Sequence, residues 1–246
     1  MQTELDTKRM ISIGADKDRV ITVGNLKFDQ CVPTVTTEEK ENLYTMLGLK
    51  KGQTIFIAGS THKGEETIVL EVYENLKHTY EDLILMLAPR HPERFDEVAD
   101  LLAHRPLRSI RKTDMKMEEK SNHHDIILLD TIGELSKFYS IGTIIFVGGS
   151  LVSTGGHNVL EPVAYKKAVI FGPYMDNFSE ISRCLRESGG GLQVNNRKEF
   201  LSQAEMLLKN DAERDKLGEK AFAVIAHNQG AINKAMEVIE RFIGDA

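Results

Sequence analysis

The stretch G-G-S-L-V-S-T-G-G-H-N-V-L-E, residues 148–161, follows the apolar run I-I-F-V at 144–147 and precedes Pro162. The apolar run predicts a buried strand, and the glycines of the stretch allow positive φ angles and a close approach of the backbone to a ligand. Asn158 and Glu161 have the spacing of a capping box, and Pro162 falls in the first turn of the expected helix. A strand, a glycine-rich turn and a helix in this order predict an anion-binding turn, because free N–H groups point out of a helix N-terminus.

A second turn of the same construction lies upstream. The run D-I-I-L-L at 125–129 predicts another buried strand, and D-T-I-G-E follows it, with Thr131 and Glu134 at capping-box spacing. An ordinary capping box without a ligand explains either turn taken alone. Two such turns at the carboxyl ends of parallel strands favour a shared ligand crevice, which open α/β sheets form at that edge.

The rest of the chain alternates short apolar runs with amphipathic segments. Strand-like runs lie near residue 22, from 54, from 83, at 125–129, at 143–147 and from 168. Helical patterns lie at 64–77, 92–103, 133–140, 159–165 and 178–188, and then at 197–209, 211–226 and 229–243 without a further strand signal. The alternation predicts the α/β class, a Rossmann-like, doubly wound parallel sheet with helices on both faces, followed by a helical C-terminal tail.

Two segments depart from this rhythm. Residues 105–124 are charged and poor in aliphatic side chains, which predicts a surface loop with a short strand at 107–110. The first thirty residues begin with a helix-like segment at 4–13 and resemble the exit from a preceding domain. We therefore expect residues 1–30 to be an interdomain segment from a missing N-terminal domain, and residues 31–246 to be a Rossmann-like domain with C-terminal helices.

Composition excludes several classes of function. The 246 residues are 41% hydrophobic, enough for a sizeable core, and a net charge of -6 argues against general binding to nucleic acid. Cys31 and Cys184 lack a C-x-x-C partner, so neither a disulfide framework nor a zinc site is expected. We expect no membrane span and no signal peptide, because no apolar run approaches the ~20 residues of a spanning helix and the N-terminus is polar. No motif for a metal, a P-loop or a dinucleotide cofactor occurs, so we expect no cofactor.

Two further strand ends carry candidate ligands. Ser60, in A-G-S-T-H, offers a hydroxyl to a phosphate or a sugar, although ordinary turn chemistry explains this segment equally well. Arg90, in P-R-H-P-E-R, suits bidentate contact with a phosphate, the alternative being an ion pair with Glu93. His157 adjoins the glycine turn without a nucleophile motif, so a packing or hydrogen-bonding role is at least as well supported as acid–base catalysis.

These motifs together are similar to one known family. The segments are G-N-L-K-F-D at 24–29, S-T-H at 60–62, P-R-H-P-E-R at 89–94, D-T-I-G-E-L at 130–135, G-G-H-N-V-L-E-P at 155–162 and F-G-P-Y-M-D-N-F at 171–178. Spread in order along the chain, they resemble the 3-deoxy-D-manno-octulosonic acid (Kdo) transferases of lipopolysaccharide biosynthesis.

The resemblance implies a two-domain GT-B glycosyltransferase fold. The N-terminal half of the family binds the lipid A precursor and holds the general-base glutamate, and the C-terminal half, which this chain resembles, binds the donor CMP-Kdo. We therefore name no catalytic residue. By resemblance, the residues that contact cytidine monophosphate (CMP) are Pro89, Arg90, Ile132, Gly133, Glu134, Asn158, Val159, Leu160 and Glu161.

The implied reaction is a metal-independent, inverting transfer of Kdo to a sugar hydroxyl of the lipid A precursor, with this chain inactive alone. The implied location is cytoplasmic, with the parent enzyme peripheral on the inner membrane. Two alternatives stay open from the residues themselves: another GT-B glycosyltransferase that uses a UDP-sugar, and a nucleotide-binding module without catalysis.

Overall fold

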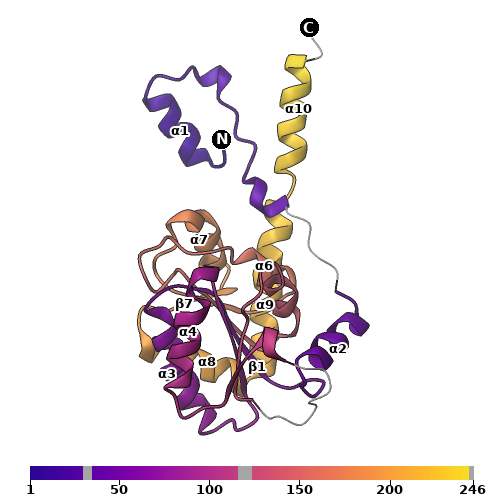
Figure 1. Cartoon of the computed structure of the whole chain (residues 1–246). Coiled ribbons are helices and arrows are strands. Elements are labelled where there is room, and N and C mark those ends of the chain that lie inside the picture. The colour runs from indigo at the N-terminus through magenta and orange to yellow at the C-terminus, as the bar shows by residue number, and fades with distance from the viewer. Residues whose placement is uncertain (30–34, 116–123, 244–246) are drawn as a thin grey trace. The chain divides into compact units, whose positions relative to one another are not determined.

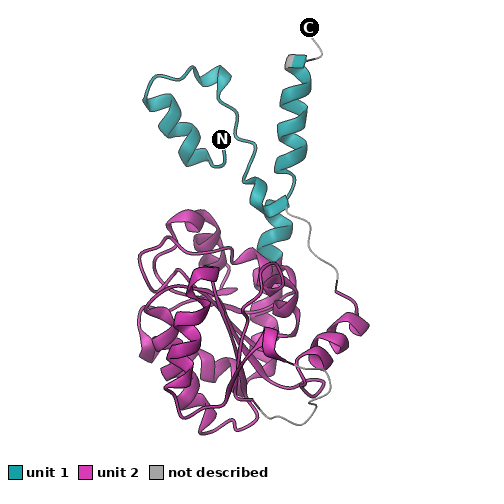
Figure 2. Cartoon of the chain, in the orientation of Figure 1, with its two compact units in different colours: residues 1–32, 223–246 teal, residues 33–222 magenta. Residues whose placement is uncertain are grey.

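The computed structural model describes residues 1–29, 35–115 and 124–243 (Figure 1). The chain divides into two compact units, one formed by residues 33–222 and the other by residues 1–32 together with 223–246 (Figure 2). The larger unit contains the sheet and every residue proposed above for the site.

The larger unit is built on a parallel sheet. Its strands are β1 Ile55–Thr61, β2 Ile84–Pro89, β3 Ser109–Arg111, β4 Ile126–Leu128, β5 Ile144–Val147, β6 Val169–Phe171 and β7 Gly191–Gln193. They lie in the order β3-β4-β2-β1-β5-β6-β7, and each pair of neighbours is parallel. The order reverses beside β1, where the chain continues to β2 on one side and β5 occupies the other, so the topological switch point lies between β1 and β5.

Helices connect and cover these strands (Figure 1). The α-helices of this unit are α2 Thr37–Met46, α3 Glu65–Lys77, α4 Phe95–Ala103, α5 Leu135–Phe138, α6 Leu160–Ala164, α7 Ser179–Glu187 and α8 Arg197–Lys209, with α9 Asp211–Asn228 next in the chain. Short 3-10 helices lie at Pro92–Arg94, Lys112–Asp114, Tyr139–Ile141 and Asp176–Phe178.

Burial of the central strands on both faces explains why their sequences are unbroken apolar runs. β2, β4, β5 and β6 are buried at every position, because helices cover both faces of a parallel sheet. Phe200 of α8 packs edge-on against Phe56 of β1 and face-tilted against Phe146 of β5, with ring centroids 5.8 and 4.8 Å apart. These three rings join α8 to the centre of the sheet.

The predicted fold class and the helical C-terminal tail are confirmed. The strand expected near residue 22 is wrong: residues 20–25 form no strand, and the N–H of Val23 bonds instead to the carbonyl of Met1. The expected strand at 107–110 lies two residues later, as β3, and residues 116–123 of the charged loop lie outside the described residues.

Two elements were missing from the prediction. α2 buries only Leu43, so its apolar pattern is weak, although Thr36 and Glu39 form a complete capping box. β7 begins in a glycine run that is typical of a turn. Gly191 serves packing there, because an added Cβ would lie 2.8 Å from the Cβ of Leu185 and 2.9 Å from the ring of Phe171.

The smaller unit joins the first and last segments of the chain. It contains α1 Glu4–Ser12, the 3-10 helices Lys17–Arg19 and Leu26–Asp29, and α10 Ala231–Ile243. The Asp29 carboxylate accepts hydrogen bonds from the backbone N–H groups of Gly230 (2.6 Å) and Ile232 (2.7 Å), so it caps the start of α10. The assignment of residues 1–30 to an interdomain segment stays a prediction.

One stripe of α10 is apolar and exposed. Ile232, Met236, Ile239 and Ile243 lie at helical spacing and are 46%, 48%, 46% and 69% exposed. An apolar stripe of this kind marks a surface for contact with another chain or domain. Among the described residues, no helix has both the length and the apolar content that a membrane span requires.

Phe200→Ala tests the core described above. Removing a fully buried ring leaves a cavity, so we expect the free energy of unfolding to fall by about 3–5 kcal/mol. Urea denaturation followed by circular dichroism measures this change. Lys198→Ala on the exposed face of the same helix is the control, with an expected change within about 0.5 kcal/mol. Equal losses in the two variants would contradict this account of the core.

Candidate functional site

Four loops leave the sheet at the same edge. β1, β2, β4 and β5 are neighbours and all run in parallel, so the residues that follow them emerge together at the carboxyl edge. These residues include Ser60, Arg90, the turn at 132–134 and the turn at 148–161. The structure therefore brings the predicted site residues to one edge of the sheet, which we call the rim; their roles there stay predictions.

Ser60 interrupts the end of β1. The pairing of β1 with β2 shifts between Gly59 and Thr61, and Ser60 between them has a φ of 55°. A left-handed conformation is unfavourable for a residue with a Cβ and is found mostly where the surrounding structure enforces it. This bulge redirects the chain at the rim, immediately before His62.

The backbone N–H groups of the glycine loop are already occupied. Glu65, the first residue of α3, is 0% exposed, and its carboxylate accepts hydrogen bonds from the N–H groups of Gly149 (2.7 Å), Ser150 (3.0 Å) and Leu151 (2.8 Å). It accepts a fourth from His62 (2.9 Å). We expected these glycines to bring the backbone close to a ligand; at Gly149, Ser150 and Leu151 a carboxylate of the protein occupies the N–H groups instead.

The Glu65 carboxylate joins the loops on the two sides of the switch point. Burial raises its pKa, and the four N–H donors act in the opposite direction because they stabilise the charged form. Space for the carboxylate depends on Gly148, where an added Cβ would lie 2.8 Å from Oε2 of Glu65 and 2.5 Å from the carbonyl oxygen of Ser60. Gly148 is therefore needed for packing and Glu65 for hydrogen bonding within the loop.

Two histidines join the loops that follow β1 and β5. The Nε2 atoms of His62, after β1, and His157, after β5, are 2.7 Å apart, and the two rings stack with centroids 5.0 Å apart. The ring of His91, after β2, meets that of His62 edge-on at 5.1 Å. Three loops thus place imidazoles in one cluster, and sequence reasoning considered only His157 among them.

Burial and positive neighbours keep this pair uncharged. Burial, His62 and Arg90 lower the pKa of His157 to about 4. Burial is also the main cause that lowers the pKa of His62, followed by His91 and Arg94. Near neutral pH the hydrogen bond therefore joins two neutral rings, one donating its Nε2–H and the other accepting it.

Arg90 is an exposed cation at the rim. Among the described residues its guanidinium has no ion pair, and the alternative of a pair with Glu93 is wrong, since Glu93 lies instead 3.7 Å from Nδ1 of His91. Its charge acts on Glu161, His62 and His157. Arg90 is thus available to a ligand.

The two predicted capping boxes are wrong in detail. α6 begins at Leu160 with Val159 as its N-cap, and Asn158 instead accepts the N–H of Leu160 through Oδ1 (3.1 Å) and donates through Nδ2 to Glu161 (3.4 Å). α6 has five residues and α5 has four, too few for the helix dipole that we expected to attract an anion.

Glu134 has partners other than the expected cap. It precedes α5, and its carboxylate accepts from Nζ of Lys112 at 2.8 and 3.1 Å and from the hydroxyl of Thr131. Burial raises the pKa of Glu134, but Lys112 and Thr131 outweigh burial and hold that pKa below its usual value. A ribose hydroxyl that binds here has to share the carboxylate with Lys112.

The remaining residues that we expected to contact CMP differ in their exposure to solvent. Pro89, Val159 and Leu160 are buried, so their side chains are not presented to a ligand. Ile132 is 79% exposed, and the neighbouring Gly133 has a φ of 84° that favours glycine. This exposed turn offers an apolar surface at the rim.

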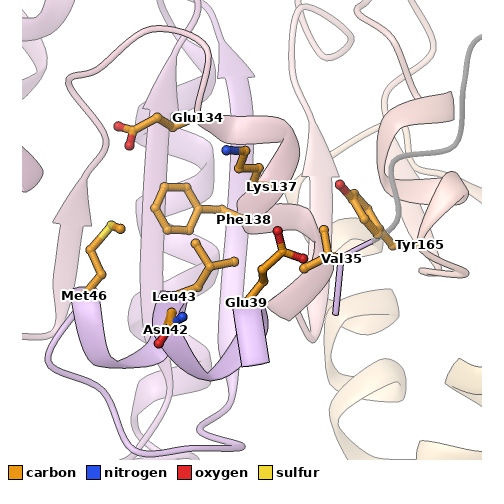
Figure 3. Close-up of a pocket in the computed structure, with 9 residues that line it drawn as sticks. All are labelled: Val35, Glu39, Asn42, Leu43, Met46, Glu134, Lys137, Phe138 and Tyr165. Atoms are coloured by element: carbon orange, nitrogen blue, oxygen red, sulfur yellow. The ribbon is translucent and has the colours of Figure 1, made fainter. Parts of the chain in front are cut away.

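A cavity of about 240 Å³ adjoins this turn (Figure 3). Its walls come from α2 and the residue Val35 before it, from the segment 134–138, and from Tyr165 after α6. They consist of Val35, Glu39, Asn42, Leu43, Met46, Glu134, Lys137, Phe138 and Tyr165. Sequence reasoning missed this cavity because it missed α2.

Comparison with known proteins finds relatives of this chain. No family model matches the chain. It is 38% identical over 243 residues to the 3-deoxy-D-manno-octulosonic acid transferase of Haemophilus influenzae, a match that covers 98% of this chain and 56% of that protein. The chain is thus a relative of the Kdo transferases along about half of their length. It is also 34% identical over 212 residues to the Kdo transferase of Aquifex aeolicus, across 85% of this chain and 53% of that protein.

A solved structure shows which part of a Kdo transferase this chain matches. The C-terminal CMP-Kdo binding domain of WaaA from Acinetobacter baumannii superposes with a TM-score of 0.69 at 27% identity, covering 76% of this chain and 96% of that domain. The chain spans about half the length of the curated Kdo transferases that it matches. The structure that the chain matches is thus the domain named for binding CMP-Kdo.

Glu65→Gln tests the carboxylate in the glycine loop. Glutamine keeps the shape but has a single acceptor oxygen, and its NH2 group would face backbone N–H donors. We expect the free energy of unfolding to fall by about 2–4 kcal/mol, the cost of losing charged hydrogen bonds in a buried place. Urea denaturation measures the loss, and Glu81→Gln, at an exposed position, is the control. A loss below about 0.5 kcal/mol, the size expected for a surface change, would contradict the assigned role.

The histidine pair predicts how stability depends on pH. Unfolding restores the pKa of His157 from about 4 to about 6.5. Between these pH values the unfolded chain binds a proton at His157 and the folded chain does not. The stabilisation is present above pH ~6.5 and is lost as the pH falls toward 4; after allowance for solvent screening it amounts to about 1 kcal/mol. Urea denaturation at several pH values should show a shallower acid dependence for His157→Gln. An unchanged dependence would contradict the neutral state of the pair.

Proposed function

We propose that this chain binds CMP-Kdo as the donor-binding half of a glycosyltransferase that moves Kdo to a lipid A precursor. The convergence of Ser60, Arg90, the turn at 132–134 and Glu161 at one rim carries the proposal. The names of the Kdo transferases and of the CMP-Kdo binding domain support CMP-Kdo as the ligand.

The rim suggests a role for each group. Arg90 pairs with the phosphate of the donor, and its fixed positive charge stabilises the negative charge that grows on CMP as the bond to Kdo breaks. Glu161 and Glu134 accept hydrogen bonds from the ribose hydroxyls, and the Ser60 hydroxyl contacts the phosphate or the sugar. Exposed backbone at Gly133 and Ile132 lies against the nucleoside.

The proposal includes an N-terminal half with the acceptor site and the general base. Transfer across a cleft requires both walls to position the reactants, so the donor half alone lacks the contribution of proximity. The exposed apolar stripe of α10 supports contact with such a half, and so does the length of the curated relatives. Since the acceptor is a membrane lipid, we place the whole enzyme peripherally on the cytoplasmic face of the inner membrane.

Titration with nucleotides tests the donor. We expect the chain to bind CMP more tightly than UMP in isothermal titration calorimetry. Arg90→Ala should weaken CMP binding by about 1.5–3 kcal/mol, the range of a charged hydrogen bond. Arg186→Ala, at an exposed position of α7, is the matched control and should leave the affinity unchanged. Tighter binding of UMP would overturn the assignment of the donor.

A transfer assay tests the division of labour between the halves. We expect no transfer of Kdo from CMP-Kdo to a lipid A precursor by this chain alone, because the base and the acceptor site are on the other half. Fusion to the N-terminal half of a related Kdo transferase should restore transfer. Turnover by the unfused chain would contradict the division, and a CMP-binding fusion without activity would favour a non-catalytic module.

A further inference from the structure

At the rim beside the switch point, the backbone N–H groups of the glycine loop are occupied and a cluster of side chains lies close by. The N–H groups of Gly149, Ser150 and Leu151 are taken by Glu65. An acidic ligand group beside this part of the loop therefore meets side chains and not these three N–H groups. His62 and His157 contact each other there, and the charge of Arg90 acts on both.

We propose that Arg90 and the His62–His157 pair form the subsite for an acidic group of the donor, and that the pair takes up one proton when this group binds. The inference rests on the proposed function, because it names the groups of the same rim that meet the donor's charge. Phosphate and carboxylate share the relevant chemistry, which is an oxyanion that accepts charged hydrogen bonds.

The geometry of the pair explains why one proton is taken up. In the free chain a single hydrogen lies between the two Nε2 atoms, which are 2.7 Å apart. A proton added to the accepting Nε2 leaves two N–H groups that face each other. One ring then turns its N–H toward the ligand, and the imidazolium donates a charged hydrogen bond to the oxyanion.

The charges around the pair favour this change only when an anion is present. His62 faces His91, Arg90 and Arg94 from the loop after β2, and Glu66 from α3. Arg94 is neutralised by Glu66 (2.6 Å) and Glu97 (3.2 Å), so Arg90 is the cation without an ion pair among the described residues of this cluster. Burial is the largest cause that keeps the imidazoles neutral, and a bound oxyanion opposes it by compensating Arg90 and by accepting a hydrogen bond from the imidazolium.

Calorimetry of the whole chain tests the proposal. The probe is the methyl phosphodiester of CMP, which carries one charge and does not itself titrate near neutral pH. Titrations at pH 6.5 in buffers of different ionisation enthalpy measure protons bound per ligand, and we expect close to one. A parallel titration with free Kdo separates the two sources of the oxyanion: uptake with the diester assigns the subsite to phosphate, and uptake with Kdo assigns it to carboxylate.

Variants add an independent measurement. His157→Gln keeps a neutral hydrogen-bonding group but cannot be protonated, so we expect about tenfold weaker binding at pH 6, little difference at pH 8 and no proton uptake. His78→Gln, at the opposite end of α3, is the control and should behave as the unmodified chain. If His157→Gln does not fold, the proton count of the unmodified chain still decides the question.

The results that would overturn this inference differ from those that would overturn the proposed function. Binding of the diester or of Kdo without proton uptake by either, or uptake that persists in His157→Gln, would overturn this inference and leave the proposed donor intact. No binding of CMP or of either probe would overturn the proposed function itself.

Discussion

The site depends on one buried carboxylate. Glu65 reaches from the start of α3 into the glycine loop and accepts four backbone N–H groups, one from its own turn and three from the loop after β5. Buried N–H groups without partners are costly, and a glycine-rich loop has no side chains to satisfy them. The carboxylate therefore fixes the loop before any ligand arrives, and it leaves recognition of the ligand to the side chains around it.

Preorganisation of this kind has a chemical benefit. The loop is held by an internal anion, so a donor does not have to order it on binding, and less of the binding energy is spent on that step. Nearby, Arg90 has no ion pair among the described residues, whereas Arg94, four residues later, is compensated by Glu66 and Glu97. One positive charge at the edge of a neutral histidine cluster suits a leaving group whose negative charge grows during the reaction.

The sequence predicted the sheet better than the site. Unbroken apolar runs such as 144–147, alternating with helical patterns, indicate buried strands, and their parallel order places the loops together at one edge. The glycine loop was a less certain guide, because spacing alone does not reveal that Glu65, more than 80 positions away, fills it. The histidine cluster was equally hidden, since His62, His91 and His157 meet only after three strands are aligned. The exposed cation at Arg90 was predictable because it directly follows a buried strand.

Asp29 ties the two extremities of the polypeptide into a single folding element. Its carboxylate satisfies the first turn of α10 across about two hundred positions of sequence, so neither extremity is an independent appendage. Trimming the chain to a minimal soluble domain thus requires that both segments be removed or both retained. Removal of the N-terminal segment alone would leave the first N–H groups of α10 without their cap, and removal of either segment alone would expose apolar surface on the other.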